Sequence, residues 1–262
     1  TAEGYAVYAH DQRGHGRTAR TYAGLGHFAD SDGWSRIVRD LDELQRRIRS
    51  EEPQVPIFLL GHSMGSLVVQ HYLCEYADGL EGAILSGSAR GGKRAQRRVA
   101  GWLARIERLR MGRSGQSALL RRLLFGRFNK SFEPTRTEYD WLSRDEREVD
   151  KYVADPLCGF VLSPQSMCDM LNALGLLDDP ASLARIPKDL PVYVFSGSED
   201  PAHAELEGIK SLLADYERAG LERVQHRIYA GGRHEMLHET NAEEVCADLI
   251  EWLDSALRER GH

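Results

Sequence analysis

The join between two apolar segments at residues 55–77 constrains the fold more than any other stretch of this chain. Residues 55–63 contain a continuous apolar run, which is typical of a strand buried on both faces. Residues 64–77 follow without a spacer and have the apolar pattern of a helix. A buried strand that turns at once into a buried helix predicts a parallel sheet covered by helices.

The same alternation recurs along much of the chain. In residues 34–50 the apolar side chains recur at helical spacing, at Ile37, Leu41, Leu44 and Ile48. We expect further strands at residues 5–11, 80–88, 190–200 and 223–231, and further helices at residues 211–220 and 242–257. The predicted fold class is therefore α/β, with a mostly parallel sheet and flanking helices.

Residues 90–185 break this alternation, because they contain helical patterns and no convincing strand. We interpret them as a helical cap inserted into a core made of residues 1–89 and 186–262. Residues 90–136 hold 14 lysines and arginines against two acidic residues, with apolar side chains between them. Such a segment can contact an anionic membrane surface peripherally or attract anionic ligands, and it can also be the solvated face of ordinary cap helices. No RNA or DNA module accompanies the charge, so nucleic acid is not an expected partner.

Bulk composition limits the class of protein further. The 262 residues are 42% hydrophobic, which suffices for a sizeable core, and the net charge is −6. The four cysteines are scattered without a C-x-x-C pair, a usage typical of reduced thiols in a cytoplasmic protein. No apolar run approaches the roughly 18 residues of a membrane span.

A G-x-S-x-G motif, residues 61–65, lies at the join between the strand and the helix. A sharp turn there would expose the hydroxyl of Ser63, and the two glycines would keep side chains from colliding. The helix N-terminus would offer free N–H groups to a developing oxyanion. The alternative is a serine helix cap with glycines for packing. We interpret His62, beside the serine, as a packing residue.

A serine hydroxyl needs a base to become a nucleophile, and the base needs an orienting carboxylate. In this strand–turn–helix context the partners follow in the order Ser, Asp or Glu, His. The predicted acid is Asp200, next to Glu199 at the end of the segment 190–200, with Asp178 and Asp179 as fallback acids. The predicted base is His234, three residues after the last strand.

Residues 234–238 also match the zinc-protease pattern H-E-x-x-H. That pattern binds zinc only when a helix places both histidines on one face. Two glycines directly after a strand, Gly231 and Gly232, instead place His234 in a loop. We therefore expect no metal and no cofactor, and interpret His238 as part of the turn into the last helix.

Five segments carry a family resemblance: YAHDQRGHGRT, LLGHSMGS, YVADPLCGF, FSGSEDP and YAGGRHEMLHE. With them the chain resembles the α/β-hydrolase fold and, within it, the bacterial monoacylglycerol lipase and lysophospholipase group of serine hydrolases. The resemblance implies that Ser63 is the nucleophile, Asp200 the orienting acid and His234 the general base. It implies that the backbone N–H of Met64 is one oxyanion donor. The implied substrate is a monoacylglycerol or a lysophospholipid, hydrolysed through an acyl-enzyme.

The chain departs from this family at its N-terminal end. The family has an early strand and a His-Gly loop that supplies a second oxyanion N–H, and both should precede residue 4. We therefore expect a chain without its first strands, with the strands at 5–11 and 55–61 left unpaired at one edge or paired directly. Losing one oxyanion donor costs about 10²–10³ in turnover, so weak activity is expected.

Three alternatives stay open at the level of sequence. An aminopeptidase or a thioesterase uses the same three residues on the same fold, and the pocket decides between them. A metalloprotease would use His234 and His238 as ligands. A catalytically silent binding module is the third.

Overall fold

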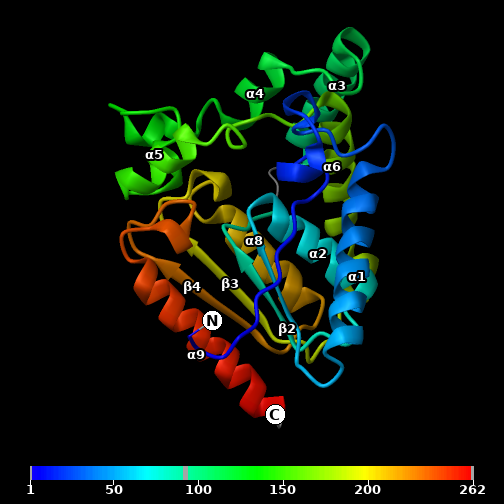
Figure 1. Ribbon diagram of the computed structural model, residues 1–262, viewed down its shortest axis with the longest axis vertical. Helices are drawn as coiled ribbons and strands as arrows, with labels where there is room; N and C mark the ends of the chain where they lie inside the picture. Colours follow the sequence, from blue (N-terminus) through cyan, green and yellow to red (C-terminus); the bar gives the residue numbers. More distant parts are fainter. Residues whose placement is uncertain (1, 91–93, 261–262) are drawn as a thin grey trace.

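The computed structural model describes residues 2–90 and 94–260, and its centre is a four-stranded parallel sheet (Figure 1). The strand order is the chain order, β1-β2-β3-β4. The strands are β1 (Phe58–His62), β2 (Gly82–Ser86), β3 (Val192–Gly197) and β4 (Val224–Tyr229). They confirm the predicted parallel α/β sheet and four of the five predicted strands.

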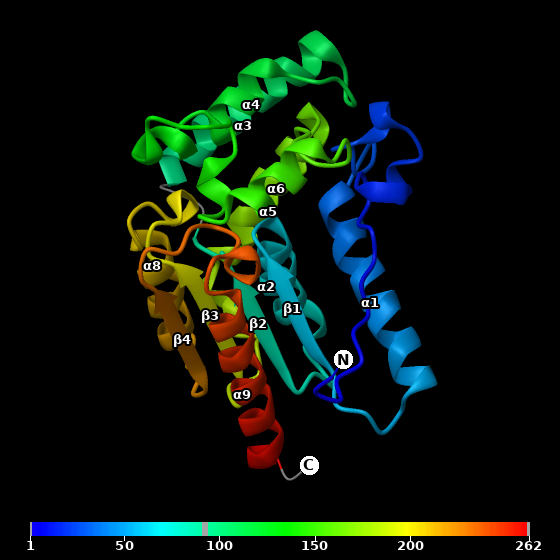
Figure 2. The same cartoon turned by 60° about the vertical axis from the view of Figure 1, so that its left-hand side comes forward.

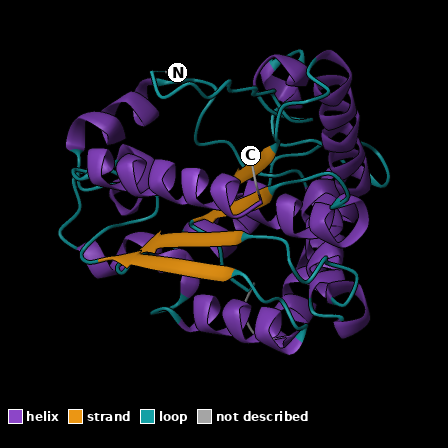
Figure 3. Ribbon diagram, turned by 90° about the horizontal axis from the view of Figure 1, so that it is seen from below, coloured by secondary structure: helices purple, strands orange, loops and turns teal. Residues whose placement is uncertain are grey.

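Alternate residues of each strand face opposite layers of helices. Ala83 and Leu85 of β2 belong to the larger apolar cluster, whereas Ile84 between them belongs to the smaller one. The larger cluster includes side chains from α1 (Gly33–Glu51), α2 (Met64–Tyr76) and α8 (Glu207–Arg218). The smaller cluster includes side chains from α9 (Ala242–Arg260), which crosses the other face of the sheet (Figure 3).

The stretch between β2 and β3 is helical in the part of the chain that the structure describes. It contains α3 (Arg94–Met111), α4 (Ala118–Phe125), α5 (Glu146–Ala154), α6 (Pro164–Leu177) and α7 (Pro180–Leu183). Figure 2 shows α3, α4 and α5 above the edge of the sheet at which the strands end. Short 3-10 helices complete the fold: η1 (Gly16–Ala19), η2 (Tyr22–Gly24), η3 (Phe128–Phe132), η4 (Asp140–Leu142), η5 (Pro201–His203) and η6 (Met236–His238). The division into a core and a separate cap at 90–185 stays a prediction.

Helix α6 connects this inserted stretch with the core. It begins at a Ser-Pro pair, in which Ser163 caps the helix by accepting from the Ser166 N–H and Pro164 fills the first turn. Met167 and Ala173 of α6 are buried in the same apolar cluster as α1 and α2. The helix therefore packs directly on the core layer.

The predicted strand at residues 5–11 is wrong. The segment has no regular secondary structure, and Val7 is 75% exposed. A strand forms only where a neighbour accepts and donates backbone hydrogen bonds, and among the described residues β1 pairs with β2 alone. The segment runs instead as an extended chain, with the Tyr5 hydroxyl donating to Asp254 of α9 at 2.6 Å.

Candidate active site

Ser63 stands at the turn between β1 and α2 in a strained backbone conformation. Its φ of 52° and ψ of −121° lie outside the regions that a residue with a side chain adopts freely. Its N–H donates to the carbonyl of Ser86 at the end of β2, at 2.9 Å, which fixes the turn to the sheet. A Cβ on Gly61 would lie 2.4 Å from the carbonyl oxygen of Gly65, so the first glycine of the motif is required for close approach. A Cβ on Gly65 would meet only a side chain at 3.8 Å.

The structure brings the three predicted site residues together in one chain of hydrogen bonds. His234 Nε2 lies 2.9 Å from Ser63 Oγ, although 171 residues separate them. On the other side of the ring, His234 Nδ1 lies 2.9 Å from Asp200 Oδ2. The three residues come from the ends of β1, β3 and β4, which all face the same edge of the sheet. Both nitrogens of the imidazole are therefore engaged within this set.

Asp200 is buried and held by several donors. Its Oδ2 accepts from the Ser196 hydroxyl at 3.1 Å, and its Oδ1 accepts from the Ala202 N–H at 2.8 Å. The two fallback acids are engaged elsewhere. Asp178 pairs with an arginine of α3, and Asp179 caps α7. The structure therefore brings Asp200 to the histidine and leaves the other two away from it.

The site shifts three pKa values in directions that suit proton transfer from the serine. Burial lowers the pKa of His234, but the Asp200 carboxylate raises it by more, so the net shift is upward. Burial raises the pKa of Asp200, and the interaction with His234 outweighs it, so that carboxyl stays ionised. Burial and the nearby His234 lower the pKa of His62 to about 3, which keeps that ring neutral. Of the two neighbouring imidazoles, only His234 is therefore placed to accept a proton.

Two residues that sequence reasoning missed hold the His234 ring. The backbone N–H of His234 donates to the backbone carbonyl of Trp141 at 3.4 Å, and the ring centroids of the two residues are 5.1 Å apart. Gly87 has a φ of 55°, and a Cβ there would lie 3.1 Å from His234 Cε1. Gly87 lies inside the predicted strand at 80–88 and directly after the observed end of β2, and a glycine near the end of a buried strand was a signal that could have found it. No sequence signal pointed to Trp141.

The two histidines of the H-E-x-x-H pattern have separate partners. His238 is exposed, and its Nδ1 lies 2.9 Å from Glu235 Oε2. His234 is buried against Asp200 and Ser63. Within residues 2–90 and 94–260, no group of three or more His, Cys, Asp or Glu side chains is arranged to hold a metal ion.

A cavity of about 780 Å³ opens onto the Ser63 hydroxyl and the His234 ring. Met64, whose N–H is among the first of α2, lines it as well. Most of its wall is apolar and comes from α4, η3 and residues 157–162: Leu124, Phe125, Phe128, Leu157, Phe160 and Leu162. Arg121, Glu138 and Glu235 add a few polar groups. A largely apolar pocket with few polar groups is the usual form of a site for an organic ligand.

A serine on a strained strand-to-helix turn, backed by a histidine and an aspartate at neighbouring strand ends, defines an α/β hydrolase of the serine hydrolase class. The profile of the family described as serine aminopeptidase, S33, matches residues 1–241. The chain belongs to this family.

Relatives place the chain near the monoglyceride lipases and esterases. It is 27% identical to the monoacylglycerol lipase of Mycolicibacterium smegmatis, over 98% of this chain and 80% of that protein. It is 28% identical to the monoglyceride lipase of Mus musculus, over 90% of this chain and 72% of that protein. The fold of a thermostable carboxyl esterase from Bacillus coagulans superposes with a TM-score of 0.83, at 24% identity, over 94% of this chain and 79% of that one.

Across the described ranges 2–90 and 94–260, no helix combines the length and the apolar character needed to cross a membrane.

Proposed function

We propose that this protein hydrolyses a carboxylic ester of a lipid, a monoacylglycerol or a lysophospholipid, through an acyl-enzyme on Ser63. One observation carries the proposal. The hydrogen-bond chain from Asp200 through His234 ends on a serine hydroxyl that faces a cavity with mostly apolar walls. An acyl chain fits such walls, and the serine lies where an ester carbonyl would be attacked.

The geometry supports the following sequence of proton transfers. His234 Nε2 takes the proton of Ser63 Oγ as the oxygen attacks the ester carbonyl, and the imidazolium then gives it to the leaving alcohol. Water enters, gives a proton to the same nitrogen and attacks the acyl-enzyme, which releases the fatty acid and restores the serine. Asp200 holds the ring in the tautomer with its proton on Nδ1 and stabilises the imidazolium.

The Met64 N–H is the proposed donor to the oxyanion of both tetrahedral intermediates. It lies directly after the nucleophile, at the N-terminus of α2, where the first N–H groups have no partner within the helix. The positive end of the helix dipole adds to its effect. One such donor contributes about 10²–10³ in turnover.

The choice of a lipid ester rests on the cavity and on the relatives. Proteins named monoacylglycerol lipase and monoglyceride lipase match most of the chain. An aminopeptidase fits the description of the family, and a thioesterase would use the same groups. Two carboxylates in the cavity could recognise a substrate amine, but Glu138 pairs with Arg121 and Glu235 with His238.

A fluorophosphonate probe followed by a substrate panel tests this function. The wild-type protein should be labelled, and Ser63→Ala should not, whereas Ser35→Ala on the exposed face of α1 should label like wild type. Monoacylglycerols, lysophospholipids, thioesters and aminoacyl p-nitroanilides of matched size are then compared by kcat/KM. If the protein is labelled but hydrolyses none of the substrates, we would conclude that it acts as a binding module. If it hydrolyses the anilides faster than the esters, we would conclude that it is an aminopeptidase.

We also propose that α3 and α4 make peripheral contact with an anionic lipid surface. The two helices expose apolar side chains at Trp102, Leu109, Leu119 and Leu123, between basic residues. Apolar side chains beside cationic groups favour a membrane surface, where the former contact the acyl chains and the latter contact anionic head groups. Co-sedimentation with vesicles should require anionic lipid and should weaken with salt, and binding that depends on neither would exclude this contact.

A further inference from the structure

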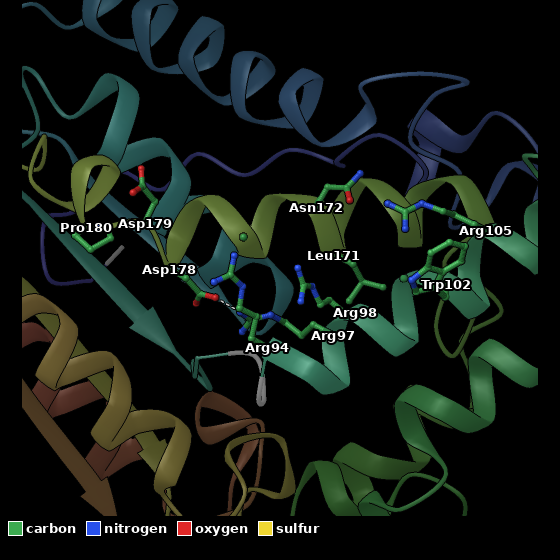
Figure 4. Close-up of a pocket in the computed structure, with 12 residues that line it drawn as sticks. Arg94, Arg97, Arg98, Trp102, Arg105, Leu171, Asn172, Asp178, Asp179 and Pro180 are labelled. Carbon is green, nitrogen blue, oxygen red and sulfur yellow. Dashed lines mark hydrogen bonds and ion pairs between the residues drawn. The ribbon is translucent and has the colours of Figure 1, made fainter.

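A second cavity lies between α3 and α6 and shares no lining residue with the cavity at Ser63. Its volume is about 520 Å³. Four arginines of α3 line one side, namely Arg94, Arg97, Arg98 and Arg105. We call this cavity the arginine groove. Figure 4 shows the side chains of Arg94, Arg97 and Arg98 gathered near the end of α6, with Arg105 further along beside Trp102.

The acidic residues of the groove neutralise only part of the charge of its arginines. Asp178 pairs with Arg97. The Asp179 carboxylate caps α7 by accepting from the N–H groups of residues 181 and 182. Among the described residues, neither Arg94 nor Arg98 has a carboxylate within ion-pair distance. The groove therefore holds an excess of positive charge.

The arginines are also close enough to one another to raise the energy of the empty groove. Positions 94, 97, 98 and 105 fall on one face of α3, and like charges three or four residues apart repel. The pKa of Arg97 lies below its ordinary value, first because of burial and then because of the neighbouring cations Arg90 and Arg94. A bound anion would offset both the repulsion and the desolvation.

The groove has room for a ligand between its two helices. A Cβ on Gly175 of α6 would find nothing within 4 Å, and a Cβ on Gly101 of α3 would meet only the Arg105 side chain at 3.9 Å. At the open end, Trp102 is 66% exposed, and the Arg105 guanidinium carbon lies 5.9 Å from its ring centroid. Two adjacent guanidinium groups without a carboxylate, next to open space, match the oxygens of a tetrahedral anion.

We propose that the arginine groove is a binding site for a dianionic phosphate monoester, separate from the ester-hydrolysing site. The phosphate accepts from Arg94 and Arg98, and Trp102 forms the wall beside the organic part of the ligand. The same chemistry occurs in a soluble phosphorylated molecule and in the head group of phosphatidic acid. The site binds and does not react, so it does not depend on the proposed hydrolase activity.

Calorimetric titration of the full chain with inorganic phosphate at low salt tests the site, with Trp102 as a local reporter. The other three tryptophans, Trp34, Trp141 and Trp252, are buried, so a change in the exposed-tryptophan emission reports on this groove. We expect saturable binding together with a saturable fluorescence change. Trp102→Phe should remove the fluorescence change and leave the calorimetric signal.

Substitution of the arginines locates the binding. Loss of one charge-assisted hydrogen bond should raise the Kd for phosphate about tenfold or more. We expect this increase for Arg94→Gln and for Arg98→Gln, and a larger increase for the double variant. Arg39→Gln, an exposed arginine on α1, makes the same charge change elsewhere and should bind like wild type. Absence of saturable binding, or equal affinity in the double and Arg39→Gln variants, would overturn the proposal. Circular dichroism confirms that each variant is folded.

Two further probes distinguish the source of the phosphate. One is glycerol 3-phosphate in solution, and the other is phosphatidylcholine vesicles with and without phosphatidic acid. Tight binding of glycerol 3-phosphate without a gain on vesicles indicates a soluble ligand. Vesicle binding that requires phosphatidic acid and is lost in the double variant, but not in Arg39→Gln, indicates the lipid head group. If neither probe is sensitive to the double substitution, the site does not exist.

Discussion

The two cavities of this protein differ in whether their charged side chains have partners within the protein. At Ser63 the buried carboxylate has its partners in place, since Asp200 accepts from His234, Ser196 and a backbone N–H. In the arginine groove, Arg94 and Arg98 have no carboxylate partner in the part of the chain that the structure describes. The first arrangement is ready for a charge that develops during a reaction. The second suits a charge that a ligand brings with it.

The largest expected effect comes from removing the carboxylate that orients the histidine. Asp200→Asn should lower kcat for ester hydrolysis by about 10⁴, because the amide favours the wrong imidazole tautomer and no longer stabilises the imidazolium. The change is nearly isosteric, so the fold should survive. Initial rates on the best ester of the panel measure the effect, together with the rate of fluorophosphonate labelling.

The same substitution in the groove provides the matched control. Asp178→Asn removes the partner of Arg97 and leaves the Ser63 site untouched, so kcat should stay within about twofold of wild type. Phosphate affinity should rise, because the groove then contains one negative charge fewer. Equal losses of kcat in the two variants would show that the two cavities are not independent.

A smaller loss should follow from a methyl group at Gly87. Its Cβ would lie 3.0 Å from His62 Cε1 and 3.1 Å from His234 Cε1 in a backbone conformation with positive φ, so one of the two rings or the turn must shift. Displacement of a catalytic group by about 1 Å costs roughly 10²-fold, and Gly87→Ala should lower kcat/KM by about this amount. Gly101→Ala, in the wall of the groove, adds the same methyl where the nearest atom is 3.9 Å away and should leave kcat/KM unchanged. Full activity of Gly87→Ala would mean that the His234 ring is not fixed by this contact.

The pH dependence of the two cavities should differ. The base is neutral His234, so kcat/KM should fall about tenfold for each pH unit below its pKa. Burial lowers that pKa, but the Asp200 carboxylate raises it above the ordinary value of 6.5, so the loss should begin above pH 6.5. In Asp200→Asn burial is opposed only by the Glu235 carboxylate, so the midpoint should move to lower pH than in the wild type. Arginines stay charged throughout, so phosphate affinity should follow only the second ionisation of the ligand, near pH 6 for a phosphate ester.

Much of the sheet could be predicted because each buried strand is an apolar run of its own. The strands β1 to β4 lie within the predicted segments at 55–63, 80–88, 190–200 and 223–231. The segment at 5–11 has a similar apolar pattern and still forms no strand. A strand needs a hydrogen-bonding neighbour, and that depends on the rest of the sheet instead of on the segment itself.

The site residues could be predicted because fold geometry places them at strand ends. Ser63 is predicted from the G-x-S-x-G motif at the join of a strand and a helix, and Asp200 and His234 from their places at the ends of two later strands. The structure brings the three within hydrogen-bonding distance. Trp141 and the arginine groove could not be found in this way. They depend on how helices pack against one another, and one sequence without its structure does not fix which faces of α3 and α6 meet.

The smallest expected effect is a gain in stability at Gly175. This glycine lies inside α6, where it costs conformational entropy relative to alanine, and a Cβ there would touch nothing within 4 Å. Gly175→Ala should therefore raise the free energy of unfolding by about 0.5–1 kcal/mol. Urea denaturation measures this as a higher midpoint with an unchanged slope. The gain would be absent if the open space in the groove were already filled by ordered groups that the methyl displaces. If the urea midpoint rises while kcat/KM for ester hydrolysis is unchanged, a change in stability at the groove does not affect catalysis at Ser63.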